Sequence, residues 1–260
     1  MQLSELYEKI DARYPKKLSD DYIAAYGGHD NSGILIDCAG EVTGAVFSLD
    51  FSMAAIEAAE KAGYNLLVTH HPAIFFPVSS LRQGDALGAR LLRAARGGIG
   101  VVSMHLNMDC AAGGIDESLA EAAGAKETQI VERLQGGGYG RVFQVPAKTL
   151  SAFASSLQEK LGAKRAFVYG DENRTVEKAA SFCGAGVDAG AVAAAKRCGA
   201  QVIVSADIKH NFICDALESG IAVVQLTHYA SENYGFWKIY QTLRDELGVP
   251  SVYHTDACML

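Results

Sequence analysis

The first half of the chain alternates short apolar runs with amphipathic segments. Between residues 43 and 123 the apolar runs have the length of strands, and the segments that follow them have the 3.6-residue period of helices. The expected strands cover 44–49, 65–69 and 100–104, and the expected helices cover 53–62, 85–95 and 116–123. This (βα)₃ pattern predicts parallel strands that are joined by right-handed crossovers.

The second half repeats this plan. Its expected strands cover 176–182, 201–205 and 222–226, and its expected helices cover 188–198, 209–217 and 230–247. Residues 58–69 align without gaps on 194–205, and residues 98–102 align on 220–224. A common βα pattern could produce one such match, whereas two matches in the same order favour an internal duplication.

A helix and an additional strand precede each (βα)₃ segment. They are expected at 3–13 and 33–37 in the first half and at 150–161 and 166–169 in the second. The domain organisation that follows is a first αβ(βα)₃ repeat over 1–125, a connector over 126–147 and a second repeat over 148–260. The connector contains Gly136-Gly137-Gly138, which suits a hinge or, equally, a plain hairpin turn.

Composition narrows the class of protein. The 260 residues are 49% hydrophobic and 20% charged, as in a globular protein, and the length fits one large α/β domain or two small ones. The net charge of −7 gives no general attraction to nucleic acid or to an anionic membrane. No apolar run approaches the roughly 20 residues of a membrane span. Lys164 and Arg165 could bind a small anion, but a solvated surface is the simpler interpretation, and no role is assigned to them.

The six cysteines form no Cys-x-x-Cys pair, which argues against a zinc ribbon and a thioredoxin-like motif. The N-terminal residues are expected to form an amphipathic helix rather than a signal peptide. Reduced thiols and a cytoplasmic location are therefore expected.

Candidate chemistry gathers after the strands, where ligands bind in parallel α/β sheets. Five of the seven histidines follow predicted strands. The polar residues at these strand ends are His70, His71, His105, Asn107, Asp109, Asp207, His210, His228 and Glu232.

Two of these groups have the spacing of metal ligands. His228 and Glu232 are four residues apart, which places them on one face of a helix, although a surface ion pair has the same spacing. His70 and His71 leave a buried strand together and can each serve a different ion of a pair, or one can be a core and one a surface histidine. Asp109 can add a carboxylate or be a loop acid, while His105 and Asn107 are better placed to orient other ligands.

The predicted ligands are therefore His70, His71, Asp109, His228 and Glu232. Three imidazoles with two carboxylates suit two divalent ions of Zn, Mn, Fe, Co or Ni, because Mg or Ca would not require histidine. Such a pair would typically activate a water for hydrolysis.

The sequence resembles the Nif-three-like dinuclear-metal hexameric proteins, which are also described as GTP cyclohydrolase type 2 homologues. The resemblance covers essentially the whole chain. It is carried by Asp30-Asn31-Ser32-Gly33, Thr69-His70-His71-Pro72, His105-Leu106-Asn107-Met108-Asp109, Ser205-Ala206-Asp207 with His210, and His228-Tyr229-Ala230-Ser231-Glu232. The sequence departs from the family pattern at four positions beside these motifs, namely His29, Leu106, Ala206 and Thr227, where the family often has Trp, Thr, Gly and Gly.

This resemblance implies an α/β fold of two intertwined αβ(βα)₃ repeats with mostly parallel mixed sheets and a metal site between the repeats. It implies the same five ligands and a ring-like homohexamer. It also suggests a metal-dependent hydrolase of the GTP cyclohydrolase type 2 homologue kind that acts on a nucleotide-like small molecule, with His210 or Asp207 handling protons. The alternative is a non-catalytic hexameric adaptor or regulator that binds metal and protein partners.

Overall fold

The computed structural model describes all 260 residues, and the chain forms two compact units. The first unit contains residues 1–111 and 237–256, and the second contains residues 112–236 and 257–260. No helix is long and apolar enough to cross a membrane. The repeat boundaries expected near residues 125 and 148 concern the duplication of the sequence and stay a prediction.

The first unit is built on a five-stranded sheet with the order β1-β4-β3-β2-β11. Its strands are β1 (Gly33–Ile36), β2 (Ala45–Ser48), β3 (Leu66–Thr69), β4 (Gly100–Ser103) and β11 (Ser251–His254). The strands β4, β3, β2 and β11 are parallel, and β1 pairs antiparallel with β4. The helices are α1 (Leu3–Arg13), α2 (Lys16–Tyr26), α3 (Met53–Ala62), α4 (Ala86–Arg96), α5 (Leu106–Cys110) and the end of α10 (His228–Leu243).

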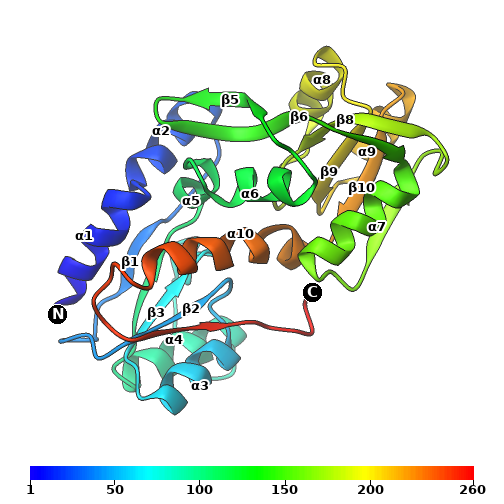
Figure 1. The fold of residues 1–260 in the computed structure, drawn as a ribbon. Coiled ribbons are helices and arrows are strands. Elements are labelled where there is room, and N and C mark those ends of the chain that lie inside the picture. Colours follow the sequence, from blue (N-terminus) through cyan, green and yellow to red (C-terminus); the bar gives the residue numbers. More distant parts are fainter. The chain divides into compact units, whose positions relative to one another are not determined.

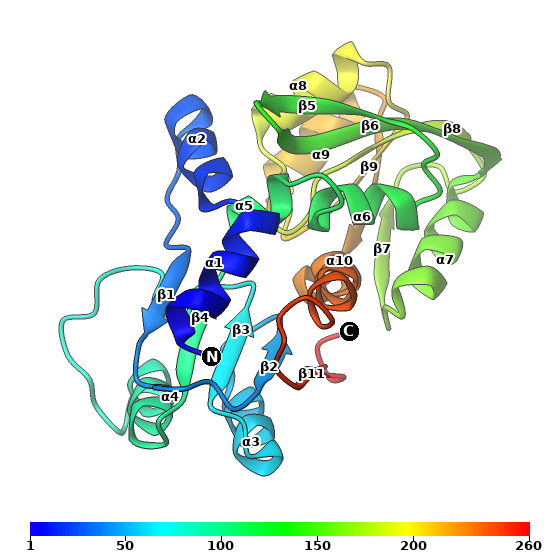
Figure 2. The same ribbon diagram turned by 60° about the vertical axis from the view of Figure 1, so that its left-hand side comes forward.

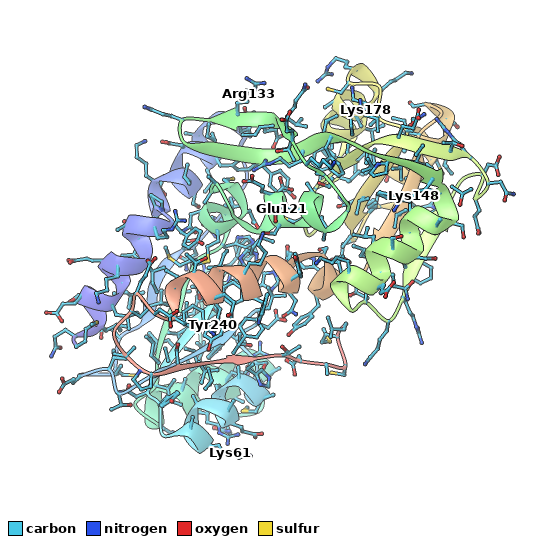
Figure 3. All side chains as sticks on the ribbon, viewed as in Figure 1. Lys61, Glu121, Arg133, Lys148, Lys178 and Tyr240 are labelled. Carbon is cyan, nitrogen blue, oxygen red and sulfur yellow. The ribbon has the colours of Figure 1, made fainter.

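Alternation along the strands fills both faces of this sheet. Val46 faces a core with Ile56 of α3 and Leu91 of α4, which lie together on one side of the sheet (Figure 1). The next residue, Phe47, points the other way, and its ring centroid lies 5.2 Å from that of Tyr240 on α10, which Figure 3 labels. Because both faces are covered, the strands are buried throughout and show no polar alternation.

The second unit is built on a six-stranded sheet with the order β5-β6-β8-β9-β10-β7. Its strands are β5 (Thr128–Leu134), β6 (Gly137–Thr149), β7 (Ala166–Tyr169), β8 (Thr175–Ser181), β9 (Val202–Ala206) and β10 (Ala222–Leu226). The helices are α6 (Ile115–Ala122), α7 (Leu150–Leu161), α8 (Ala189–Arg197), α9 (His210–Glu218) and the start of α10. Figure 2 shows α6 and α7 on one side of this sheet, and α8 and α9 on the other.

The strands β8, β9 and β10 are parallel, whereas both edges of this sheet are antiparallel. The glycine run of the predicted connector joins β5 to β6 as a hairpin. At the other edge β7 runs antiparallel to β10, so the start of β7 lies beside the carboxyl end of β10. The predicted α/β class with mixed sheets is confirmed.

Candidate metal centre

Three imidazoles of the first unit lie together at the carboxyl ends of two neighbouring strands. His70 and His71 follow β3, and His105 follows β4. The ring centroid of His70 lies 4.9 Å from that of His71 and 5.0 Å from that of His105. One nitrogen from each ring could serve a shared ion, because these nitrogens lie within 4.8 Å of one another.

Asp109 brings a carboxylate to the same group from the short helix α5. This side chain is buried, and its Oδ1 lies 3.5 Å from Nε2 of His70. Two ligands that are each about 2.0–2.2 Å from a tetrahedral ion lie roughly 3.3–3.5 Å from one another. The distance between His70 and Asp109 therefore fits two ligands of one ion.

The Nδ1 atom of each of these imidazoles faces an oxygen of the first unit. The pairs are His70 with the backbone oxygen of Met104 at 3.1 Å, His71 with Oδ1 of Asp50 at 2.7 Å, and His105 with Oδ1 of Asp30 at 2.8 Å. An imidazole that donates from Nδ1 presents the lone pair of Nε2 to a metal, and such partners are typical of metal-binding histidines. In all three rings Nδ1 is therefore held by an oxygen of the first unit, and Nε2 is the nitrogen left to bind a metal.

Asp30 belongs to a hydrogen-bonded network that holds His105. The hydroxyls of Ser19 and Ser32 both donate to its carboxylate, and the backbone N–H of His105 donates to the Ser32 hydroxyl at 2.8 Å. Burial by itself would raise the pKa of Asp30, but His105 and the two serine hydroxyls outweigh it and hold the pKa well below its usual range. The carboxylate stays ionised and fixes the ring of His105.

Asn107 joins this network to the N-terminal helices. Its side chain is fully buried and donates to the backbone oxygen of Tyr14 at 2.6 Å, and its Oδ1 lies 3.2 Å from Oγ of Ser32. The predicted orienting role of Asn107 fits these bonds. His105, in contrast, is placed beside His70 and His71 as a candidate ligand.

His29, directly before Asp30, packs its ring against the loop that follows His71. It stacks on Phe76 with ring centroids 4.9 Å apart and an interplanar angle of 9°. Its Nε2 lies 2.7 Å from the backbone oxygen of Phe75, and Asn31 donates to the backbone oxygen of Ile74 at 2.6 Å. The loop after His71 is therefore held by the same segment that orients His105.

The second unit carries a pair of candidate ligands at the start of α10. Nε2 of His228 lies 3.1 Å from Oε2 of Glu232, as the four-residue spacing predicts. Nδ1 of His228 lies 2.8 Å from Oδ2 of Asp207, which follows β9. Asp207 has a φ of 46° and is the one non-glycine residue with a positive φ, a conformation that occurs often at functional sites. Asp207 therefore contacts Nδ1 of His228 as Asp50 contacts Nδ1 of His71.

Gly184 leaves the space that this pair occupies. A Cβ on Gly184 would lie 2.3 Å from Oε1 of Glu232 and 3.2 Å from Nε2 of His228. Its backbone is fixed, because its N–H donates to the hydroxyl of Ser231 and its carbonyl accepts from the N–H of Ala206. The donor set and this space both fit a divalent ion at His228 and Glu232.

The two residues predicted to handle protons lie in different surroundings. Asp207 contacts the candidate ligand His228. His210 begins α9, and its Nε2 lies 3.6 Å from Sγ of Cys214, one turn further along that helix. The sequence interpretation missed the contacts of Asp50 with His71 and of Asp30 with His105, although Asp50 lies two residues after the end of β2 at Ser48.

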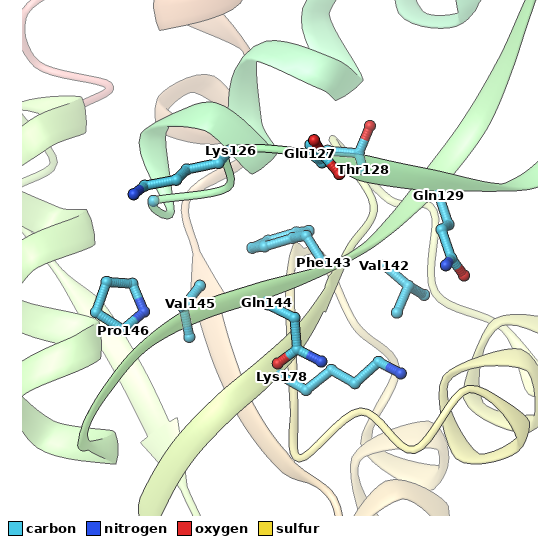
Figure 4. Close-up of a pocket in the computed structure, with 11 residues that line it drawn as sticks. Lys126, Glu127, Thr128, Gln129, Val142, Phe143, Gln144, Val145, Pro146 and Lys178 are labelled. Carbon is cyan, nitrogen blue, oxygen red and sulfur yellow. The ribbon is translucent and has the colours of Figure 1, made fainter.

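Two cavities open on the second unit. One has a volume of about 520 Å³ and is lined by the β5–β6 hairpin, by residues just before β5 and by Lys178, with no predicted ligand among its residues. Figure 4 shows that the ammonium groups of Lys126 and Lys178 point in opposite directions there, so they do not converge on one ligand. The other cavity has a volume of about 620 Å³ and is lined by Asp207 and His228.

The fold and these side chains define an α/β protein with a histidine-rich candidate metal centre. The chain belongs to the Duf34/NIF3 (NGG1p interacting factor 3) family, whose model matches residues 1–256. The predicted resemblance is therefore confirmed.

The relatives of the chain share most of its length. It is 27% identical over 252 residues to a GTP cyclohydrolase 1 type 2 homolog of Clostridium perfringens, a match that covers 95% of this chain and 93% of that protein. It is 30% identical to the Nostoc protein of the same description, with 74% of each chain covered. Among solved structures, reduced HcgD of Methanocaldococcus jannaschii is 26% identical with a TM-score of 0.78, and 97% of each chain is covered. The Bacillus cereus protein related to NIF3 has a TM-score of 0.86 at 19% identity, with 97% and 96% covered, and supports the fold.

Proposed function

We propose that this protein is a metal-dependent hydrolase in which His70, His71, Asp109, His228 and Glu232 hold two divalent ions. One observation carries this proposal: each of the four imidazoles at the strand ends has its Nδ1 beside an oxygen. Core or surface histidines have no need for such uniform orientation, whereas metal ligands do. His105 adds a further imidazole beside His70 and His71.

The side chains fit Zn, Mn, Fe, Co or Ni better than Mg or Ca, because imidazole nitrogen is a poor ligand for the last two. When bound, a divalent pair supplies Lewis acidity and lowers the pKa of water for hydrolysis. The protein's own contributions are the orientation of the rings by Asp50, Asp30 and Asp207 and a proton acceptor, for which His210 and Asp207 are the candidates.

The substrate we propose is a nucleotide-like small molecule. The support comes from the relatives that are described as homologs of GTP cyclohydrolase 1 type 2, and GTP is therefore the first substrate to test. A homohexamer and a cytoplasmic location also remain proposals, and light scattering of the purified protein would measure the first of these.

Metal content per subunit tests the ligand set. Elemental analysis of the wild-type protein should find about two equivalents, as a dinuclear site requires. His71→Ala and Glu232→Ala should each lower this value, and Lys196→Ala should not. Wild-type protein that retains no metal after incubation with each of the five ions would overturn the proposal.

A non-catalytic metal-binding adaptor is the second candidate. It is favoured by the description of the family, which names an interacting factor. Full metal content without turnover of GTP or of other nucleotides would support it over the hydrolase.

A further inference from the structure

The cavity of about 620 Å³ beside His228 contains two positive charges that the proposed metal chemistry does not use. Its lining includes Lys164, Arg165, Phe167, Asp207 and His228, all in the second unit. We infer that Lys164 and Arg165 bind the anionic group of a small molecule in this cavity. The idea that the cavity holds a substrate rests on the proposed function. The idea that it binds an anion does not depend on that function.

The topology of the sheet brings these charges to the ligand-bearing edge. The edge strand β7 is antiparallel to β10, with Ala166 opposite Leu226 and Phe167 opposite Gln225. The residues just before β7 therefore lie beside those just after β10. Lys164 and Arg165 precede Ala166, and Thr227 and His228 follow Leu226. A parallel β7 would have sent the two basic residues to the opposite end of the sheet.

Neither positive charge is paired with a carboxylate. Arg165 is exposed and makes no hydrogen bond or ion pair. Lys164 donates to the backbone oxygen of Ala257, which occupies one of its three N–H groups and leaves its charge uncompensated. Asp207 is the acidic side chain that lines this cavity, and it is hydrogen-bonded to His228. In a protein with a net charge of −7, two such neighbours make a local field that favours an anion.

Residues 258–260 form another wall of this cavity, and hydrogen bonds hold this segment to the sheet edge. Thr227 donates to the backbone oxygen of Met259 at 3.0 Å and accepts from the N–H of Ala230 at 3.1 Å. Together with the bond from Lys164 to Ala257, this fixes residues 257–260 along the cavity, which Cys258, Met259 and Leu260 line. A glycine at position 227 would lack the hydroxyl that makes both bonds.

The dimensions and the apolar lining indicate a small ligand. A volume of about 620 Å³ lies within the range of small-molecule sites. Phe167 is 55% exposed and offers a ring face for a planar or apolar part of the ligand. Arginine and lysine together recognise phosphate or carboxylate oxygens, so the ligand class is a small organic anion with an apolar or planar portion.

Binding of pyrophosphate, measured by isothermal titration calorimetry, tests the anion site. It should be run on protein freed of metal with a chelator and dialysed, so that ions cannot bind the probe, and then repeated on metal-loaded protein. Pyrophosphate should bind the metal-free protein, and the double variant Lys164→Ala/Arg165→Ala should bind roughly tenfold or more weakly, as the loss of charge-assisted hydrogen bonds predicts. Rising NaCl should weaken binding to the wild type.

The double variant Lys196→Ala/Arg197→Ala on α8 is the matched control, since it removes the same charge from the same unit and should bind like the wild type. If the loss of Lys164 loosens residues 257–260 and impairs folding, Arg165→Ala alone carries the test, and Arg165→Lys should restore part of the affinity. Absence of pyrophosphate binding, or equal binding by wild type and Arg165→Ala, would overturn the inference. Pyrophosphate binding without any hydrolytic turnover would instead leave the anion site standing and remove the proposed hydrolase.

Discussion

Nδ1 of His71 lies 2.7 Å from Oδ1 of Asp50, and the two residues come from the ends of neighbouring parallel strands. A carboxylate oxygen also lies 2.8 Å from Nδ1 of His105, in Asp30, and 2.8 Å from Nδ1 of His228, in Asp207. A carboxylate in this position fixes the ring and makes Nε2 a stronger donor to a metal. The three carboxylates are therefore expected to set metal affinity without binding the ions.

Removal of Asp50 should weaken metal binding while the ligands themselves remain. Asp50→Ala should lower the affinity of the protein for Zn by about 10- to 100-fold, and Asp50→Asn by less, because an amide oxygen can still accept from Nδ1. Competition with a chromogenic chelator would measure this. Asp37→Asn, an exposed acid of the same unit, is the control and should bind like the wild type. An unchanged affinity in Asp50→Ala would remove the orienting role.

Gly184 should be essential for the pair formed by His228 and Glu232. In Gly184→Ala the new Cβ would meet Oε1 of Glu232 at 2.3 Å, so the carboxylate has to move and metal content should fall. The positive φ of 55° should cost about 1 kcal/mol of unfolding free energy as well.

Gly162→Ala separates these two effects. Gly162 has a φ of 65°, and a Cβ at this position would meet no atom within 4 Å, so the substitution carries the backbone cost alone. Thermal unfolding should show a loss in both variants, and elemental analysis should show a loss of metal in Gly184→Ala alone. Equal metal content in the two would contradict the proposed ligand pair.

The residues that follow parallel strands can be placed from sequence, because a parallel strand delivers its next residues to one edge of the sheet. The structure brings His70 and Asp109 together in the first unit and His228 and Glu232 together in the second, and their role as metal ligands stays a prediction. No role was predicted for Asp50, since a single acid after a strand has the same pattern as a helix cap. Lys164 and Arg165 could not be placed beside His228 from sequence, because this depends on the direction of β7, and strand direction has no local sequence signal.

Some helices and strands could not be predicted, because they have weak local patterns or depend on distant pairing. The helix α2 carries charges over its first residues and few apolar ones, so its period is weak. The five-residue α5 is too short for a period, and β11 depends on pairing with β2, far away in the sequence. The helix at 3–13 and the strand at 222–226, in contrast, have clear local patterns and were predicted with the observed bounds.

Substitution of His210 and substitution of Asp207 should have different effects on metal binding and on turnover. Asp207→Ala should lower metal affinity, because Asp207 orients His228. His210→Ala should leave metal content unchanged and, if His210 accepts a proton in the reaction, lower kcat by about 10²- to 10⁴-fold. Parallel measurements of metal content and of turnover separate the two roles. Wild-type turnover in His210→Ala would assign it no part in proton transfer.

The unfolding free energy should depend on pH through Asp116. Its carboxylate is fully buried in the second unit, 3.0 Å from Nη1 of Arg141, and it accepts from the N–H of Cys183. Burial raises the pKa of Asp116 to about 6, against the opposing effects of Arg141 and the backbone N–H groups. The folded protein therefore holds a proton that the unfolded chain, with an ordinary pKa near 3.8, has already released.

The contribution of Asp116 to the unfolding free energy should therefore be greatest below pH 4. This contribution should be lost as the pH rises to about 6. The shift of roughly two pKa units corresponds to about 3 kcal/mol. Urea unfolding of metal-free protein between pH 4 and 7 would measure the slope, which Asp116→Asn should reduce and the exposed control Glu159→Gln should not. Because Asp116→Asn leaves Arg141 buried beside a neutral group, it can fail to fold. Carbon-13 NMR of the Asp116 carboxyl in the wild type then decides, and a midpoint below pH 4 would refute the prediction.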